Sequence, residues 1–517
     1  MTAAGSSPKT RSTLLRAAVA VLGAAALASA LGSSSGCGSN APPPPDAGPD
    51  AGPDAGPVVY SWSAPVTIDG TPVVVDATQY SFSDLVAAVD RQGRPAVAYF
   101  ESRTGAGTYP LVLARELADS VWTREVVPAS RDGGDLTGHY GLGLAFDAQG
   151  NPLLAYQGGQ PANGAGKPAA DGRWDNFVTG QSLPSDSVLA RKIAGAWTRY
   201  TLGTSSSSYV SDAAAIASTI DDSGGVIGTW SAVAADSTGA VHVVQRDVHF
   251  ASAQADYQAS NLEYGSFTLS GSTAGLTAGD MVGSAKTGEP CAADAGSCTA
   301  AGKRIVNGAG NYNRMVLAGG QPAVLFVLAP DSIAEAREVW FARRTAPAAA
   351  DNVARWTKAQ ISAAQGEVGS PPSLAYSTSA GPGGAPVFAV AFYDLTNGDL
   401  RLATSADGAA WDDEPVETLG VTGLHPAAAF GGDGKTLGVL YAYCRAPIDP
   451  TSQCNDATKQ LRFRAGTAAS GNLFSASVEK VDAVVPDGAV LIADGQGRFV
   501  AVWRDPAAGL RASRRSP

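Results

Sequence analysis

Polar side chains able to do acid–base chemistry or to hold charged groups follow apolar segments at several points along the chain. The residues of this kind are Glu101, Arg103, Arg246, Asp247, Tyr393, Asp394, Arg504 and Asp505. Carboxylates can act as general acids or bases, and arginines can grip an anion through paired hydrogen bonds. Polar residues after a buried segment are equally what a solvated loop contains. We therefore treat them as ligand-binding candidates and assign no catalytic residue.

Aromatic rings and histidines form a second group, placed just before apolar segments. Its members are Phe82, His139, Tyr140, Trp230, Tyr312 and His425. Planar rings can stack on a sugar or anchor a peptide, or they can simply pack one structural unit against the next. His139 and His425 have no carboxylate at a fixed spacing, so they do not predict a metal site. Phosphate-loop, H-E-x-x-H and nucleophile-elbow motifs are absent, and we expect no cofactor.

The elements that must position these residues recur from residue 58 to the C-terminus. Each copy has an apolar segment, a turn containing glycine, and a second apolar segment, which predicts a β-hairpin. The copies lie at 85–99, 142–156, 231–244, 315–326, 373–392, 427–441 and 489–503. A second hairpin follows most copies, and its last strand begins with an aromatic residue. These outer strands are expected to start at Trp122, Trp197, Trp356, Trp411 and Phe474.

Four antiparallel strands per repeat predict the blades of an all-β propeller. Seven inner hairpins predict seven blades, with six or eight as alternatives. The last copy lacks an aromatic-led outer strand, whereas an unpaired one, 62–67, stands before the first copy. Pairing the two would complete the last blade and leave no open sheet edge. The alternative fold is two separate β-sandwiches. It would not leave an unpaired strand at the start of the repeats and a missing outer strand at their end.

Two regions interrupt the repeat. Residues 245–307 are long and lack the regular pattern, so the third blade is expected to be the least regular. Residues 158–186 are expected to be an insertion within the second blade.

Residues 1–36 have the pattern of an export signal. Basic residues up to Arg16 precede an apolar run over 17–31, which is shorter than the roughly 20 residues that a membrane-spanning helix needs. Cys37 follows Ser-Ser-Gly, which resembles the lipobox of bacterial lipoproteins and implies a lipid-modified, N-terminal cysteine. Cleavage after Ala-Ser-Ala at 28–30, without a lipid, is the alternative.

Residues 37–57 combine the anchor cysteine with a Pro, Asp, Ala and Gly repeat. Proline biases such a chain towards extended conformations and the polar residues keep it solvated, so a disordered tether is expected. Residues 58–517 are then the propeller.

The other four cysteines bracket two short, turn-rich segments. Cys291 pairs most simply with Cys298, and Cys444 with Cys454, as loop-local disulfides formed in an oxidising compartment. Neither pair has C-x-x-C spacing, which argues against a metal site.

Composition excludes a nucleic-acid binder. The chain has 47 acidic and 36 basic residues, a formal net charge of −11. A phosphate backbone would find no Lys/Arg surface on such a protein. We expect a monomer that contacts a membrane only through its anchor.

Residues 392–403, Phe-Tyr-Asp-Leu-Thr-Asn-Gly-Asp-Leu-Arg-Leu-Ala, resemble the bacterial sialidase-like, BNR-type propeller repeats. Ser405 to Trp411 resembles a shortened Asp-box, S-x-D-x-G-x-x-W with one residue fewer. The resemblance implies a propeller, but Asp-boxes are folding devices on the blade periphery, so it says little about catalysis. That family uses three arginines on the substrate carboxylate, a tyrosine nucleophile paired with a glutamate, and an acidic proton donor. Its early Arg-Ile-Pro motif is missing here, since Arg304-Ile305-Val306 lacks the proline and lies midway along the chain.

The sequence thus predicts an exported, lipid-anchored binding module of the cell envelope, at the outer membrane or secreted. Its ligand would be a glycan or a protein. A sialidase-like glycoside hydrolase is the alternative. Three arginines at one pocket above a Tyr–Glu pair would favour the hydrolase, and a channel mouth lined by aromatic rings without that arrangement would favour binding.

Overall fold

The computed structural model describes residues 60–71, 85–101, 110–128, 141–158, 186–203, 221–250, 260–283, 289–290, 303–304, 306–330, 338–347, 354–361, 370–445, 458–468, 473 and 476–516. The chain divides between residues 57 and 58. The expected export signal, anchor cysteine and tether lie outside the described residues. Within those residues, no helix is both long and apolar enough to cross a membrane.

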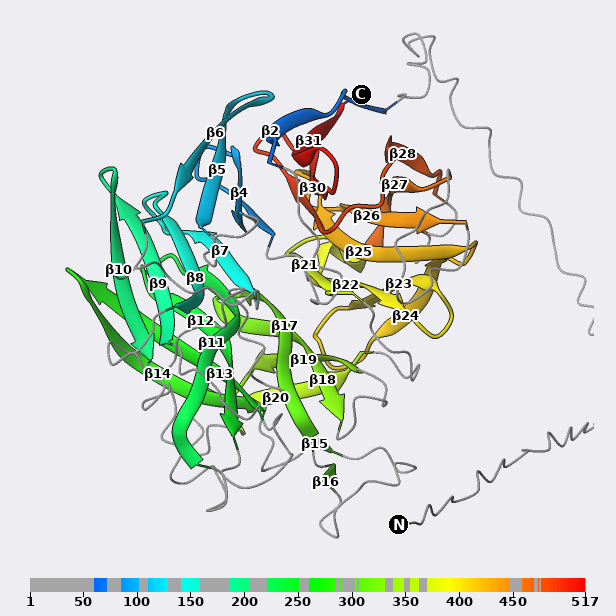
Figure 1. Ribbon diagram of the computed structural model, residues 1–517. Coiled ribbons are helices and arrows are strands. Elements are labelled where there is room, and N and C mark those ends of the chain that lie inside the picture. The colour runs from blue at the N-terminus through cyan, green and yellow to red at the C-terminus, as the bar shows by residue number, and fades with distance from the viewer. Residues whose placement is uncertain are drawn as a thin grey trace, which may run out of the picture. The chain divides into compact units, whose positions relative to one another are not determined.

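Seven sheets of antiparallel strands form the blades within the described part of residues 60–516, and Figure 1 shows how they are arranged. Blade 1 holds β3 (Val86–Val89), β4 (Pro95–Phe100), β5 (Leu111–Ala118) and β6 (Val121–Val126). Blade 2 holds β7 (Leu142–Phe146), β8 (Pro152–Gly158), β9 (Asp186–Ile193) and β10 (Ala196–Gly203). Blade 3 holds β11 (Asp221–Ala235), β12 (Val241–Phe250), β13 (Ser260–Ser270) and β14 (Thr273–Gly283).

The next three blades repeat this order. Blade 4 holds β17 (Val306–Ala318), β18 (Gln321–Pro330), β19 (Glu338–Arg344) and β20 (Trp356–Gln360). Blade 5 holds β21 (Ser373–Ser377), β22 (Val387–Asp394), β23 (Asp399–Ser405) and β24 (Asp412–Glu417), with the short 3-10 helix η3 (Pro382–Gly384). Blade 6 holds β25 (Val421–Phe430), β26 (Thr436–Cys444), β27 (Gln460–Thr467) and β28 (Glu479–Asp482). A separate ribbon pairs β15 (Glu289–Pro290) with β16 (Lys303–Arg304).

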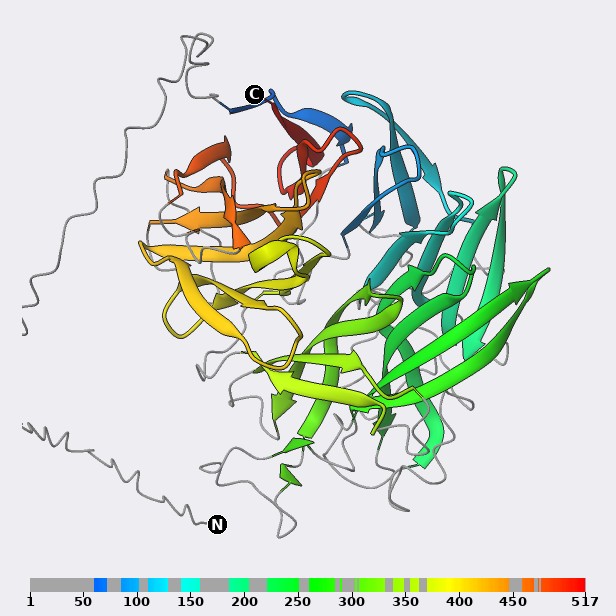
Figure 2. The same ribbon diagram turned by 180° about the vertical axis from the view of Figure 1, so that it is seen from behind.

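Blade 7 joins the two ends of the propeller, as predicted. Its strands β29 (Ala489–Ala493), β30 (Phe499–Asp505) and β31 (Gly509–Ser516) are completed by β1 (Ser61–Trp62) and β2 (Val66–Asp69). Trp62 pairs with Arg515 and Val66 with Ala512, both antiparallel. The inner strand β29 also contacts β3 of blade 1, which closes the ring, and Figure 2 shows the same closure from behind. The two-sandwich alternative is therefore wrong.

Two expectations about single strands need correction. The outer strand of blade 6 is Glu479–Asp482; of the strand expected from Phe474, residues 476–478 are not in a strand, and Phe474 itself lies outside the described residues. The irregular region 245–307 contains the end of β12 and all of β13 and β14, so blade 3 is complete and has long strands. Its outer strands are rich in Gly, Ser and Thr and have no leading tryptophan, which is why the repeat pattern did not reveal them.

Side chains from facing sheets form the core between blades. Ala98 and Leu113 of blade 1 pack with Leu142 and Leu154 of blade 2 in one fully buried cluster, and equivalent clusters lie between the other blades. Burying such aliphatic side chains contributes about 1.5–3 kcal/mol each. The blades are therefore held mainly by non-directional contacts, and specific polar groups must set their spacing.

The strand order gives the propeller two different faces. One, which we call the turn face, carries the links from first to second and from third to fourth strand. The other, the connector face, carries the links from second to third strand and from each blade to the next. Glu101, Asp394 and Asp505, which follow or end second strands, therefore lie on the connector face.

A repeated aspartate fixes the turn between the first two strands. In blade 2, Asp147 accepts hydrogen bonds from the backbone N–H groups of Gln149 (2.9 Å) and Asn151 (2.8 Å) and from Arg191 Nε (2.9 Å). Asp90, Asp236, Asp433 and Asp494 accept backbone hydrogen bonds in the same way. The sequence identified these turns by their glycines. Their aspartates also clamp the turn.

This clamp predicts acid sensitivity. Burial opposes ionisation of Asp147, but hydrogen bonds from Asn151 and Arg191 outweigh it and lower the pKa of that carboxyl below its ordinary value. A carboxyl whose pKa is lower in the folded than in the unfolded protein makes its full contribution to stability above about pH 4. That contribution is lost as the pH falls through the pKa of the folded state. We expect Asp147→Asn to cost about 1–2 kcal/mol at pH 7 and to flatten the loss of stability as the pH falls below about 4. Urea unfolding across this pH range measures both, and an unchanged acid slope would contradict the assignment.

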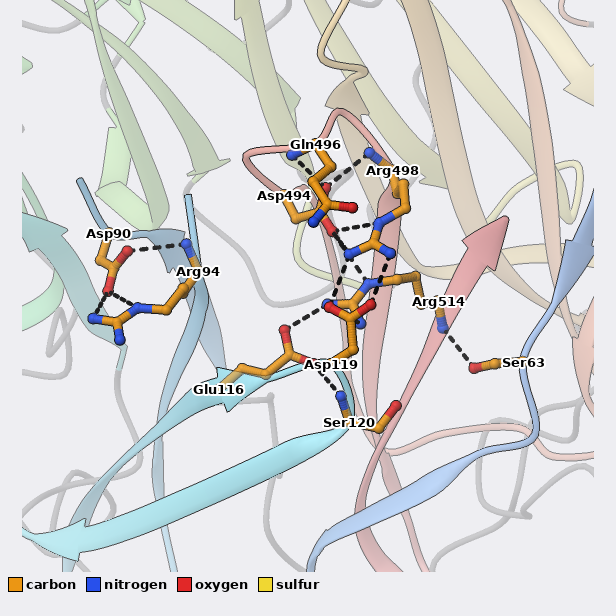
Figure 3. Close-up of polar contacts among 10 residues, drawn as sticks. All are labelled: Ser63, Asp90, Arg94, Glu116, Asp119, Ser120, Asp494, Gln496, Arg498 and Arg514. Atoms are coloured by element: carbon orange, nitrogen blue, oxygen red, sulfur yellow. Dashed lines mark hydrogen bonds and ion pairs between the residues drawn. The ribbon is translucent and has the colours of Figure 1, made fainter. Parts of the chain in front are cut away.

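Charged side chains reinforce the seam between blades 1 and 7 (Figure 3). Arg514, 7% exposed by side chain, contacts Glu116 (2.5 Å), Asp119 (3.2 Å) and Asp494 (3.2 Å). Arg498 holds Asp119 through two hydrogen bonds of 2.8 and 2.9 Å. A cavity of about 170 Å³ lies beside these groups on the turn face. In addition to the pairing of β1 and β2 with β31, these ion pairs and hydrogen bonds join blades 1 and 7 directly.

Candidate functional site

Glu101, at the connector-face end of β4, belongs to a contact between blades 7 and 1. Its carboxylate lies 3.3 Å from Arg124, which also lies 3.0 Å from Asp69 at the end of β2. Tyr99 donates a 2.7 Å hydrogen bond to Asp69, and burial together with this bond raises the pKa of Tyr99 above its usual range. Arg504 donates to the Phe100 carbonyl at 3.0 Å. This group holds neighbouring blades together.

The strand-end aspartates of blades 5 and 7 cap short turns. Asp394 accepts hydrogen bonds from the backbone of Thr396 (3.0 Å) and from Asn397 Nδ2 (2.8 Å). Asp505 likewise accepts from the Ala507 backbone (2.9 Å) and contacts Arg511 (3.3 Å). Both residues are buried, with whole-residue exposures under 10%. Their hydrogen bonds give them a structural role that is independent of any ligand.

Tyr393 and Arg246 also lie on second strands. Burial, followed by the charges of Asp394 and Asp399, raises the pKa of Tyr393 to about 12. A phenol with a raised pKa is a poor nucleophile at neutral pH. Arg246, on β12, accepts a 3.1 Å hydrogen bond from Thr229 through its backbone carbonyl. These two residues lie in different blades, 5 and 3.

Three residues of the aromatic and histidine group share an unusual backbone. Trp230, Tyr312 and His425 lie within inner strands at φ of 52°, 54° and 50°, each at a β-bulge. Left-handed φ costs a non-glycine residue about 1–3 kcal/mol, so the surrounding structure must enforce it. Trp230 and Tyr312 pack edge to face with ring centroids 4.3 Å apart and are 7% and 4% exposed. This is the blade-to-blade packing alternative, and ligand contact by Tyr312 stays a prediction.

His425 instead lines a cavity of about 150 Å³ in the central channel. The walls come from the inner strands of blades 1, 4, 5, 6 and 7, and are mostly Leu, Val, Ala and Pro with Arg314 as the charged group. Burial lowers the pKa of the His425 imidazole to about 4, so the ring is neutral at physiological pH. Its Nδ1 has no hydrogen-bond partner among the described residues. Several lining segments are the starts of inner strands, which places the cavity towards the connector face.

A Tyr–Glu pair with arginines does exist, but it is buried between blades 5 and 6. Tyr441 donates to Glu417, which Arg462 contacts at 2.5 Å and Arg464 at 3.5 Å. Tyr441 is fully buried and Glu417 is 3% exposed. Burial and the Glu417 charge raise the pKa of Tyr441 above its usual range, the opposite of what an activated nucleophile needs. The pair links two blades.

The Asp-box-like segment is a turn of the expected kind. Ser405 Oγ accepts a 2.8 Å hydrogen bond from the Gly408 backbone, and Asp407 accepts one of 2.8 Å from Ala409. A Cβ on Gly408 would lie 2.3 Å from the Phe341 ring, so only glycine fits. Trp411 packs on the same ring of blade 4. This segment therefore serves blade packing.

Sequence reasoning missed a set of buried polar residues between blades 2 and 3. Ala155 of β8 and Val243 of β12 pack together in this interface. Because side chains alternate along a strand, Gln157, Gln245 and Asp247 face it too. Three cross-strand pairs result, which we call the blade 2–3 polar cluster: Gln157 with Ser187, Gln245 with Glu263, and Asp247 with Asn261.

A sequence signal for this cluster does exist. Nine residues after the turn aspartate, blades 1, 2 and 7 carry Tyr99, Tyr156 and Trp503, all at most 3% exposed. At the same spacing from Asp236, blade 3 carries Gln245. A polar residue at a position that is otherwise a buried aromatic marks the interface.

The remaining predicted residues lie outside the described part of the chain: Arg103, His139, Tyr140, Phe82, Cys37, Cys291, Cys298 and Cys454. Cys444 ends β26 and is disulfide-bonded. Its pairing with Cys454 stays a prediction. No group of three or more His, Cys, Asp or Glu side chains within the described ranges is arranged to hold a metal ion.

Comparisons with known proteins give only remote structural likeness. No protein family and no curated protein matches the sequence. The intramolecular trans-sialidase from Ruminococcus gnavus is 13% identical, with 88% of this chain and 94% of that chain covered and a TM-score of 0.39. The α-L-arabinofuranosidase Arb93A from Fusarium graminearum is 10% identical (78% and 98% covered, TM-score 0.45), and the polysaccharide lyase Uly1 is 8% identical (88% and 98% covered, TM-score 0.46). At these sequence identities and TM-scores, the likeness indicates no activity for this chain.

Proposed function

We propose that this protein is a binding propeller of the cell envelope that takes its ligand at the connector face. The observation that carries the proposal is that the longest links between strands lie on the connector face. On the turn face, the first two strands of blade 2 are joined through residues 147–151 and its last two through 194–195. On the connector face, residues 159–185 join β8 to β9, and residues 445–459 join β26 to β27.

A face that carries the longest links is typical of binding surfaces, because a rigid scaffold can carry variable segments there at little cost to its own stability. The central cavity with His425 lies towards the same face. A saccharide is the ligand class that we test first, because the resemblance to sialidase-like repeats suggests it.

The hydrolase alternative finds less support. The strand-end carboxylates at 394 and 505 cap turns, Glu101 pairs with Arg124, and the Tyr441–Glu417 pair is buried. A catalytic nucleophile must instead reach its substrate with an available base beside it. Binding is therefore the function that the described geometry supports best.

The test compares link-shortened variants. Gly158 pairs with Asp186, so residues 159–185 can be replaced by an Asn-Gly turn that closes the hairpin. We expect the parent to bind on a glycan array, the shortened variant to melt like the parent but lose that binding, and neither to cleave a fluorogenic sialoside. A matched control replaces Ala194 on the turn face with Asn and should keep binding. Turnover of the sialoside by the parent would establish the hydrolase instead.

We also propose that Cys37 anchors the protein to a membrane. Two acyl chains and an amide-linked third give stable attachment, whereas a single chain binds only marginally. Cys37→Ala should move the protein from the membrane to the soluble fraction. Unchanged fractionation, or a mature N-terminus at Leu31, would reject lipidation and leave ordinary secretion.

A further inference from the structure

Exposed apolar side chains recur at the outer edge of the turn face, where the third strand of a blade is linked to the fourth. Blade 1 exposes Leu117 and Val121 beside this link, at 52% and 54%, and blade 2 exposes Ile193 at 41%. Tyr60, just before β1, and Val478, just before β28, are exposed at the same position in blades 7 and 6. We call these five residues the apolar rim.

The distribution of the apolar rim is its informative property. Single exposed apolar side chains occur on most protein surfaces and need no explanation. These residues instead recur at one structural position in four consecutive blades, 6, 7, 1 and 2, and Leu276 near the start of β14 continues the series into blade 3. Links between strands ordinarily present polar residues to water. A repeated departure from that rule on one face indicates contact with an apolar partner.

The chain enters the propeller at this same edge. β1 is antiparallel to β31, with Ser61 opposite Ser516, so Tyr60 lies at the turn-face end of blade 7. Residues 38–59 lead from there to Cys37, the proposed membrane anchor. These 22 residues span at most about 80 Å even when fully extended, so an anchored propeller stays within that distance of the membrane. The face that receives the anchoring chain is therefore the face that carries the apolar rim.

Ion pairing reduces the charge that the rim presents in blade 1. Asp119 lies between Leu117 and Val121 in sequence, and its side chain is 59% exposed. Arg498 contacts this carboxylate at 2.8 Å and Arg514 at 3.2 Å, which offsets its charge (Figure 3). The whole chain carries a formal net charge of −11, which disfavours approach to anionic lipid headgroups. A zwitterionic lipid surface is therefore the apolar partner that fits this edge.

We propose that the apolar rim inserts into the surface of a lipid bilayer and holds the connector face away from it. This inference rests on the proposed anchor at Cys37, which brings the bilayer within reach. A few half-exposed side chains bind a membrane weakly, because binding strength scales with the apolar area that is buried. The tether makes their binding an intramolecular event with a high effective concentration, so weak contacts suffice to set an orientation. Ligands then reach the connector face from the aqueous side.

The experiment uses residues 37–517, the chain expected after signal cleavage, with the Cys37 thiol coupled to a maleimide lipid in phosphatidylcholine vesicles. This attachment does not depend on lipidation in the cell, so failure of the anchor and failure of the docking give different results. Hydrogen exchange is measured by mass spectrometry for the coupled chain and for the same chain with its thiol blocked. We expect coupling to slow exchange at residues 117–121 and 193–196 by about threefold or more. Exchange at residues 395–398, on the connector face, should not change.

Two variants separate the rim from exposed apolar residues in general. Leu117→Ser, Val121→Ser and Ile193→Ser together remove the rim from blades 1 and 2 and should abolish the slowing. Leu395→Ser with Leu419→Ser is the matched control, because these leucines are 40% and 73% exposed on the connector face, and it should keep the slowing. Both variants should melt like the parent, since substitutions at exposed positions change stability little.

The proposal is wrong if exchange at the rim is the same in the coupled and blocked chains, or if coupling slows exchange on the connector face instead. It is also wrong if the triple serine variant keeps the slowing. Slowing in the blocked chain that grows with protein concentration would show that a second copy of the chain, not lipid, covers the rim. If the triple variant fails to fold, the comparison of the coupled and blocked parent still decides the question.

Discussion

Deleting residues 58–70 is expected to open the propeller. The deletion removes β1 and β2, exposes the edge of β31, and leaves Tyr99 and Arg124 without Asp69. Trp62 packs on Phe463 at 5.1 Å and donates to Glu479, and Ile68 is 8% exposed. Loss of this burial and of the buried hydrogen bonds should cost about 5 kcal/mol or more, a large share of the stability of an ordinary protein. Thermal melting and size exclusion would show early unfolding and association through the free edge.

The control for this prediction removes residues 38–57, the expected tether. That deletion should leave the melting temperature unchanged, because an unpacked segment contributes no buried area. If the protein without residues 58–70 melts like the parent and stays monomeric, the pairing of β1 and β2 with β31 does not hold the ring closed.

The second large effect is expected for Asp280→Ala. Asp280 is fully buried on β14 and accepts hydrogen bonds from Arg344 Nε (2.7 Å), Arg355 Nη1 (2.5 Å) and Trp356 Nε1 (3.2 Å). It thus joins the outer strands of blades 3 and 4. Removing one member of a buried charge group leaves the others uncompensated, which typically costs about 3–5 kcal/mol. Urea unfolding measures the change in the free energy of unfolding.

Asp119→Ala is the matched control for Asp280→Ala. Asp119 also pairs with two arginines, Arg498 and Arg514, but its side chain is 59% exposed. Exposed ion pairs contribute about 0–1 kcal/mol because water and salt screen them. Equal effects of the two substitutions would mean that burial does not set the strength of the blade contacts.

The propeller could be predicted from local patterns because each hairpin has a recognisable sequence of its own. The Asp–Gly turns, the alternating apolar residues and the unpaired strand at residues 62–67 all act within short stretches of chain. The outer strands of blade 3 were not predicted, because they contain few aliphatic and aromatic residues. The outer strand of blade 6, Glu479–Asp482, does not begin with an aromatic residue, so a pattern of aromatic-led strands could not locate it.

The candidate site was less predictable, because contacts between blades join residues far apart in sequence. The position of Glu101 and Asp394 on one face follows from strand order. Glu101 forms an ion pair with Arg124, and Asp394 accepts hydrogen bonds from the turn that follows it; the spacing of residues in the sequence predicts neither contact. Gln245 was within reach of sequence reasoning, since comparing equivalent positions in the repeats singles it out. His425 was found as a histidine, but its neutral state depends on burial that only the assembled inner strands create.

Closure by the N-terminal strand has a consequence for the order of events in a newly made chain. Ser63 and Ser513, in hydrogen-bond contact at the seam, are 450 residues apart in sequence. At about 5–20 residues per second, β31 appears roughly 20–90 s after the strand that it must capture. Blades 1 to 6 can form in turn during that interval, while β1 and β2 wait unpaired beside the attachment point of the tether. The nascent propeller therefore passes its whole synthesis with one sheet edge open, and a chaperone that shields a single strand would have its target there.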